Sequence, residues 1–118
     1  MRAKDALGRY GEDVAVRHLS EAGLVVLERN WRCREGEIDI VARDGDVLVL
    51  CEVKTRRSTA YGTPLEAVTD VKAARQRVLA ARWIEDRNVH PRAVRFDVVG
   101  VLASGRGPAS VRHIRGAL

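Results

Sequence analysis

Apolar and polar positions follow two different periods along this chain, and the changes between them delimit the predicted elements. Apolar residues recur every three to four positions over residues 5–22 and about 70–87, which predicts two helices. Short segments rich in β-branched and aliphatic residues predict strands. These predicted strands cover residues 24–28, 38–42, 47–55, 94–102 and 110–114. The predicted order of elements is therefore αβββαββ.

Residues that cap or end helices support these limits. Gly23 follows the first helix and Asn88 follows the second, while Thr69 or Asp70 caps the start of the second. A hairpin followed by a long helix and another strand predicts an α/β fold. We expect a mixed β-sheet flanked by helices, in which the strand after the helix lies parallel to an earlier strand. The chain of 118 residues is long enough for one domain, residues 1–118.

Charged residues interrupt the two predicted hairpin strands. Asp39, Glu52 and Lys54 lie within otherwise apolar segments, where an unpaired buried charge is costly. If Asp44 and Gly45 form the turn, alternation of side chains places all three charges on one face of the sheet. Asp39 and Glu52 are then diagonal neighbours, roughly 7–8 Å apart at the backbone. Like charges this close are destabilising unless a cation lies between them.

This spacing predicts a metal site. Carboxylate oxygens of Asp39 and Glu52 suit Mg²⁺ or Mn²⁺, and the backbone carbonyl of Val53 can add a ligand. Such ions activate water and stabilise the leaving oxygen in phosphodiester cleavage. The ammonium group of Lys54 can position the water or stabilise charge on the phosphate. The alternative is a solvated strand face with a weak ion pair, because Glu-x-Lys is common on strands.

The same residues carry a family resemblance. Asp39 with Glu52-Val53-Lys54 resembles the PD-(D/E)xK signature of the restriction-endonuclease-like nucleases, although Glu37-Ile38 stands where that signature has proline. The wider pattern resembles the YraN-like family of bacterial proteins, which is related to archaeal Holliday junction resolvases. The matching segments are residues 8–12, 30–32, 36–42, 52–56, 61–62 and 95–99, with Ala15 and Lys72.

The resemblance implies a fold, an activity and further site residues. It implies a restriction-endonuclease-like sheet and a metal-dependent endonuclease acting on DNA, including branched recombination intermediates or single strands. Resolvases of this kind act as two-fold dimers, which predicts a homodimer. Glu12 matches a helix carboxylate that completes the metal site in this group; the alternative is a solvated glutamate. Glu37 is either a further ligand or, as we favour, a rim residue paired with Arg32 or Arg34.

Charge supports a polyanionic partner. The formal net charge is +5, from 21 Lys and Arg against 16 Asp and Glu, and basic residues cluster in sequence around the predicted site. Individual arginines can equally serve only to solvate the surface. Trp31 is either a base-stacking residue or part of the core, and Trp83 is predicted to be core. The predicted nucleic-acid contacts are Arg32, Arg34, Arg56, Arg57, Lys72 and Gln76.

Other classes of function find no support in the sequence. It contains no P-loop, dinucleotide fingerprint, nucleophile elbow or zinc-ligand spacing. Cys33 and Cys51 are predicted to be free thiols. No apolar run is long enough for a membrane span and no signal peptide is evident, so we expect a cytoplasmic protein without a membrane partner. Asp97 lies in an apolar strand, and we expect a neighbouring backbone group or arginine to satisfy it.

Three functional hypotheses remain open from the sequence. The favoured one is a metal-dependent endonuclease in which Asp39, Glu52 and Glu12 hold the ion and Lys54 assists the water. The second is a nucleic-acid-binding module that retains the nuclease scaffold without its chemistry. The third is a protein-interaction scaffold, which would neither bind nor cleave nucleic acid.

Overall fold

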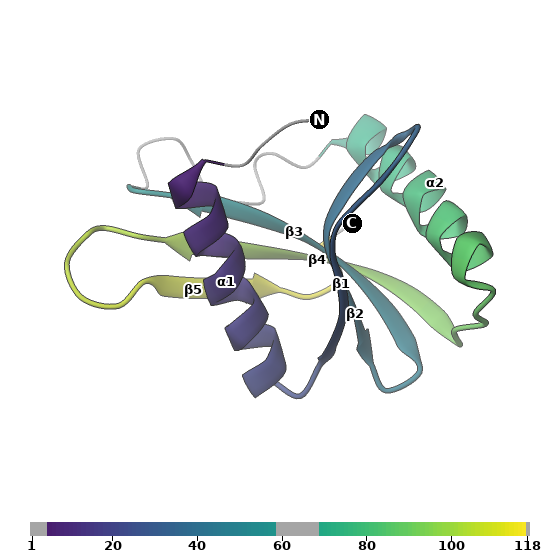
Figure 1. Ribbon diagram of the computed structural model, residues 1–118, viewed down its shortest axis with the longest axis horizontal. Helices are drawn as coiled ribbons and strands as arrows, with labels where there is room; N and C mark the ends of the chain where they lie inside the picture. The colour runs from purple at the N-terminus through teal and green to yellow at the C-terminus, as the bar shows by residue number, and fades with distance from the viewer. Residues whose placement is uncertain (1–4, 59–68, 118) are drawn as a thin grey trace.

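The computed structural model describes residues 5–58 and 69–117 as a five-stranded mixed sheet with a helix packed on each face (Figure 1). The elements are α1 (Ala6–Glu21), β1 (Val25–Cys33), β2 (Gly36–Asp44), β3 (Val47–Arg56), α2 (Asp70–Arg87), β4 (Ala93–Leu102) and β5 (Ser110–Ile114). This confirms the predicted order αβββαββ. The strands lie in the order β1-β2-β3-β4-β5; β3 and β4 are parallel and the other pairs are antiparallel. Residues 61–62, which contributed to the family resemblance, lie outside the described residues.

The helix ends agree with the capping signals. The Asp5 side chain accepts a hydrogen bond from the Gly8 N–H at 2.7 Å at the start of α1. Of the two predicted caps of α2, Thr69 is the one used, and its hydroxyl accepts from the Lys72 N–H at 3.1 Å. Asn88 ends α2 in the left-handed conformation, with φ of 52°. Each cap satisfies backbone groups that the helix itself leaves unpaired.

The apolar core has two layers, one on each face of the sheet. Val49 and Cys51 of β3 pack toward α1, while the alternate residues Leu48 and Leu50 pack toward α2. Trp83 is core as predicted, 4% exposed, and its indole N–H donates to Glu28 Oε1 at 3.1 Å. Trp31 packs against the α2 layer, which favours its core interpretation. Among the described residues no helix is long and apolar enough to span a membrane.

Two sequence predictions about the hairpins are wrong in detail. The first strand is longer than residues 24–28, because β1 lies at the sheet edge and its polar side chains can face solvent there. In the second hairpin Arg43 pairs with Leu48 rather than with Asp46, so the turn residues are Gly45 and Asp46. Gly45 has φ of 61°, which a two-residue turn with glycine in the first position requires.

The corrected register changes the predicted partner of Asp39. The partner of each β2 residue moves by two positions along β3, and the last paired residues are Ile40 and Cys51. The same register continued by one residue would place Asp39 opposite Glu52. The ladder between β2 and β3 ends before this position, so both carboxylates lie where the two strands separate.

Candidate functional site

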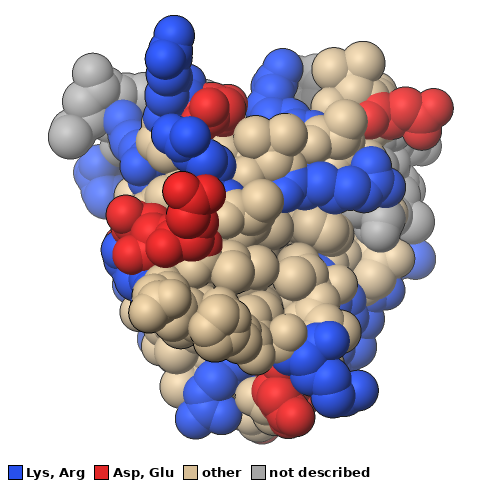
Figure 2. All heavy atoms as spheres, turned by 90° about the vertical axis from the view of Figure 1, so that its right-hand side faces the viewer, with Lys and Arg blue, Asp and Glu red and all other residues tan. Residues whose placement is uncertain are grey.

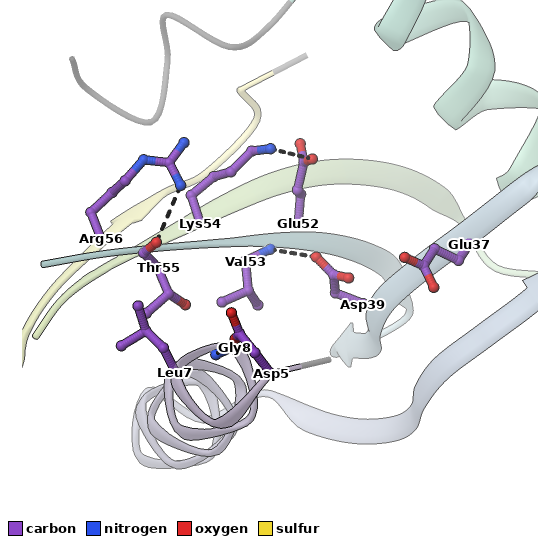
Figure 3. A pocket seen from close by; sticks show the side chains of 10 residues that line it. All are labelled: Asp5, Leu7, Gly8, Glu37, Asp39, Glu52, Val53, Lys54, Thr55 and Arg56. Carbon is purple, nitrogen blue, oxygen red and sulfur yellow. Dashed lines mark hydrogen bonds and ion pairs between the residues drawn. The ribbon is translucent and has the colours of Figure 1, made fainter. Parts of the chain in front are cut away.

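A cleft opens where β2 and β3 separate. Their pairing ends at Ile40 and Cys51, whereas β3 stays paired with β4 as far as Arg56 and Leu102. The cleft has a volume of about 530 Å³. In Figure 3 the Asp39 side chain reaches from β2 toward β3, and Glu52, Lys54 and Arg56 project from β3 on the side away from α1. Its lining residues are Asp5, Leu7, Gly8, Glu37, Asp39, Glu52, Val53, Lys54, Thr55 and Arg56.

A backbone irregularity lies next to the point where the strands separate. Asn30 of β1, in the position facing Asp39, has φ of 54°, which is uncommon for a residue other than glycine. The alternation of side chains along β2 also breaks at Asp39. Ile40 packs in the α1 layer, whereas Ile38, two residues away, packs in the α2 layer. The end of the β1–β2 hairpin consequently turns toward α2 and leaves the edge of β3 open (Figure 1).

Asp39 occupies the apex of this gap. Its Oδ2 accepts a hydrogen bond from the Val53 N–H at 2.8 Å, so the side chain takes the place of the strand partner that β3 has lost on this side. The N–H and C=O of one residue in such a ladder face the same neighbouring strand. The carbonyl of Val53 therefore faces the gap as well, beside the Asp39 carboxylate.

Glu52 brings the second carboxylate and two cationic partners. Its Oε1 lies 3.1 Å from Lys54 Nζ and also forms an ion pair with Lys72 Nζ, from the first turn of α2. Its Oε2 is buried and has no hydrogen-bond partner among the described residues. A buried carboxylate oxygen without a partner is costly. This atom therefore identifies a place where a cation or a water molecule would be stabilised.

The donor set fits a hard divalent ion. Asp39, Glu52 and the Val53 carbonyl offer oxygen ligands only, and Mg²⁺ usually combines one or two carboxylates with water and substrate oxygens. In the part of the chain that the structure describes, no group of three His, Cys, Asp or Glu side chains is arranged to hold a metal ion. The candidate ligands are therefore the two carboxylates and the Val53 carbonyl.

Glu12 is neither solvated nor part of the cleft lining. It is 2% exposed, and its Oε1 accepts from Arg29 Nε at 2.8 Å and Asn30 Nδ2 at 2.9 Å. A hydrogen bond to Asp13 and a further one to Glu12 raise the pKa of the Arg29 guanidinium. Because Asn30 faces Asp39 across the β1–β2 pairing, Glu12 holds the irregular backbone that opens the cleft.

A close helix–strand contact places α1 against the same wall. A Cβ atom added to Gly11 would lie 1.9 Å from Thr55 Oγ1, which is far inside van der Waals contact. Only glycine therefore allows α1 to approach β3 here. This contact brings the first turn of α1, with Gly8, to the edge of the cleft.

The predicted basic residues lie at different distances from the cleft. Lys72 contacts Glu52, and Arg56 lines the cleft, with its Nη1 donating to Thr55 O at 3.1 Å. Glu37 lines the cleft and pairs with Arg32 at 3.2 Å, as the rim interpretation expects. The other predicted contacts lie outside the lining: Arg34 is exposed in the β1–β2 turn, Arg57 is exposed just beyond β3, and Gln76 is half-buried on α2.

Asp97 belongs to a separate structural network. Arg95 donates two hydrogen bonds to it at 2.9 and 3.0 Å, the Gly116 N–H donates at 2.9 Å, and His113 Nε2 lies 2.8 Å away. Burial raises the pKa of Asp97, but these hydrogen bonds outweigh burial and hold the pKa below its ordinary value. The expected arginine and backbone partners are confirmed. Sequence reasoning did not anticipate His113.

The cysteines are free thiols, as predicted. Cys33 is partly buried and Cys51 is fully buried. Burial raises the pKa of the Cys51 thiol to about 12, so this group is neutral and a poor nucleophile at neutral pH. Neither cysteine lines the cleft formed by the described residues.

Comparison with known proteins identifies close relatives over nearly the whole chain. The profile of the uncharacterised protein family UPF0102 matches residues 11–101, a range that contains Asp39, Glu52 and Lys54. A UPF0102 protein of Nocardioides sp. is 62% identical over 113 residues, covering 96% of this chain and 91% of its own length. UPF0102 proteins of Kineococcus radiotolerans and Streptomyces griseus are 62% and 59% identical, and each alignment covers 98% of this chain and at least 96% of the relative.

Proposed function

We propose that this chain, which belongs to the uncharacterised protein family UPF0102, is a divalent-metal-dependent endonuclease that hydrolyses phosphodiester bonds in DNA. Membership of this family confirms the resemblance to the YraN-like proteins. The wider relation to restriction-endonuclease-like nucleases is part of the proposal. The proposal also includes branched DNA as the substrate and a two-fold dimer, both of which are supported by the resemblance alone. A cytoplasmic location stays a prediction from the sequence.

The observation that carries the proposal is the buried Oε2 of Glu52, which has no hydrogen-bond partner among the described residues and belongs to the cleft that Asp39 also lines. The two lysines contact only Oε1 of Glu52, so Oε2 of Glu52 keeps its negative charge in the cleft that the Asp39 carboxylate also lines. Two carboxylates in one cleft favour a cation between them. Asp39, Glu52 and the Val53 carbonyl would hold Mg²⁺ or Mn²⁺. A bound ion of this kind activates a water molecule and offsets charge on a phosphate.

The residues of the chain have distinct tasks in this proposal. Lys54 stays within the cleft, where its ammonium can donate to a phosphate oxygen and stabilise the charge that develops during attack. A water oxygen attacks phosphorus in line with the leaving sugar oxygen, with no covalent enzyme intermediate. Glu12 is a positioning residue: through Asn30 it fixes the strand irregularity that places Asp39 at the apex.

Basic side chains provide the approach for the DNA backbone. Arg32 and Arg56 lie at the rim or in the lining, and Lys72 reaches into the cleft from α2. Figure 2 shows the face of the molecule on which α2 lies. Lys and Arg side chains project along the upper part of this face, next to a cluster of Asp and Glu at its left and above a largely uncharged middle. Binding through such groups weakens steeply with salt.

A cleavage assay tests the proposal. Wild type and Glu52→Gln are incubated with branched, flapped and single-stranded DNA in Mg²⁺ or Mn²⁺. We expect cleavage of at least one substrate by wild type and loss of it in Glu52→Gln, which keeps the shape of the side chain. Glu35→Gln, in the exposed β1–β2 turn, is the matched control and should cleave like wild type. Equal behaviour of wild type and Glu52→Gln on every substrate would refute the catalytic role.

One observation favours the second candidate, a nucleic-acid-binding module without chemistry. Glu52 Oε1 already contacts two ammonium groups, so part of the charge at the site is neutralised without a metal ion. For this candidate we expect salt-dependent DNA binding that persists in Asp39→Ala and Glu52→Ala. Calorimetry would show no uptake of Mn²⁺ by the wild type.

A further inference from the structure

A second cavity adjoins the cleft at the end where α1 begins. Its volume is about 290 Å³, and it is lined by Leu7 and Tyr10 of α1, by Arg57 just beyond β3, and by small residues of the loop between β4 and β5. Leu7 lines both cavities, and Arg57 directly follows Arg56, which lines the cleft. A polymer that lies in the cleft can therefore continue into this cavity.

Tyr10 presents an aromatic ring at this place. The residue is 44% exposed, although it is one of only two tyrosines in the sequence and lies on a helix that packs against the sheet. The other lining residues include Ala103, Ser104, Gly105 and Gly107, which are all small. In the described segments, Tyr10 has no aromatic partner. The ring can therefore accept a planar group from outside the protein.

Arg57 adds a cation to the same cavity. Its side chain is exposed and forms no ion pair with any described residue. A guanidinium group matches the oxygens of a phosphate, and an aromatic ring offers a surface on which a base can stack. An aromatic ring and a guanidinium group without an ion pair among the described residues are together suited to bind a single nucleotide.

We propose that the second cavity binds an unpaired nucleotide of the DNA strand whose phosphate lies in the cleft, with its base stacked on Tyr10 and its phosphate bound by Arg57. This inference rests on the proposed function, since the neighbouring phosphate is the one to be cleaved. A base within a duplex is stacked between its neighbours and cannot reach the ring without being extruded. The cavity thus directs the enzyme to DNA with unpaired bases beside the scissile bond, such as a single strand or a flap.

The test measures binding without cleavage. Fluorescence anisotropy in EDTA gives the affinity of wild type, Tyr10→Ala and Tyr10→Phe for labelled oligothymidine and for a duplex of equal length. Stacking of one base is worth about 5- to 150-fold in affinity. We expect Tyr10→Ala to lose at least about five-fold on oligothymidine and to bind the duplex like wild type. Tyr10→Phe keeps the ring and should restore oligothymidine binding to within about two-fold of wild type.

Arg57→Ala provides an independent variant, because the side chain is exposed and its removal leaves the core intact. We expect weaker oligothymidine binding and a smaller dependence of affinity on salt, by about one phosphate contact. Arg92→Ala is the matched control. The Arg92 side chain is 70% exposed and pairs with Asp46 of the β2–β3 turn. Its removal should leave oligothymidine binding unchanged.

The outcomes separate this inference from the proposed nuclease activity. Wild-type oligothymidine affinity in both Tyr10→Ala and Arg57→Ala would refute the subsite, whatever the cleavage assay shows. Equal losses on single strand and duplex would refute the assignment to an unpaired base. Selective loss on oligothymidine would support the subsite even if wild type cleaves no substrate, and the cleft would then belong to a binding module.

Discussion

Asp39 has two roles in this structure, and two substitutions separate them. Its Oδ2 accepts the Val53 N–H at 2.8 Å at a part-buried position, and its charge lies in the cleft that Glu52 also lines. Asparagine retains an acceptor oxygen at the same distance from the backbone, whereas alanine leaves the N–H without its partner. The cost of an unpaired, part-buried donor is about 1–3 kcal/mol. We therefore expect Asp39→Ala to lower the free energy of unfolding by this amount and Asp39→Asn to lower it by less than about 1 kcal/mol.

Urea denaturation at pH 7 without divalent ions measures the structural role. Titration calorimetry with Mn²⁺ measures the role of Asp39 as a metal ligand. We expect both variants to lose Mn²⁺ binding, because neither alanine nor asparagine carries the negative charge of aspartate. Asp46→Asn, at an exposed turn carboxylate, is the matched control and should retain wild-type stability and Mn²⁺ binding. Wild-type Mn²⁺ affinity in Asp39→Asn would refute the ligand role. Equal loss of stability in the two Asp39 variants would refute the role of the Val53 hydrogen bond.

Three further substitutions have directions that follow from the structure. Gly11→Ala should destabilise the fold by about 1–3 kcal/mol in urea denaturation, because the added Cβ would lie 1.9 Å from Thr55 Oγ1; wild-type stability would contradict this close packing. Asp97→Asn should lower the free energy of unfolding at pH 7. The folded-state pKa of Asp97 is below its unfolded value, so its stabilisation is fully present above about pH 4 and is lost as the pH falls through the folded pKa. The gap between wild type and Asp97→Asn should therefore narrow in acid, and a constant gap would contradict the assignment. Lys72→Ala should strengthen Mn²⁺ binding in calorimetry, since the ammonium no longer competes for Glu52 Oε1; unchanged or weaker binding would show that no such competition exists.

The parts of the fold that the sequence predicted well depend on local patterns. The limits of α2 follow from Thr69 and Asn88, whose side chain and backbone complete the helix ends. The strand of residues 110–114 has the bounds expected from its alternation. That Asp39 and Glu52 line one cleft was also predictable, because a tight hairpin brings the two segments together whichever of the two registers it adopts.

The parts that the sequence did not predict depend on contacts between distant segments. β1 continues through polar residues because it lies at an edge, and nothing within its own sequence indicates that position. The left-handed conformation of Asn30 and its hydrogen bond to Glu12 join a strand to a helix 18 residues away in the chain. The ion pair of Lys72 with Glu52 likewise depends on how α2 crosses the sheet. Periodicity contains no information about either contact.

Anomalous scattering from a crystal soaked in Mn²⁺ would show whether Asp39 and Glu52 share a metal ion. We expect a peak in the cleft within bonding distance of both Asp39 and Glu52, with Lys72 Nζ displaced from the Glu52 carboxylate. A map with no peak between these side chains, and with both lysines still paired to Glu52, would contradict the metal site and with it the proposed nuclease.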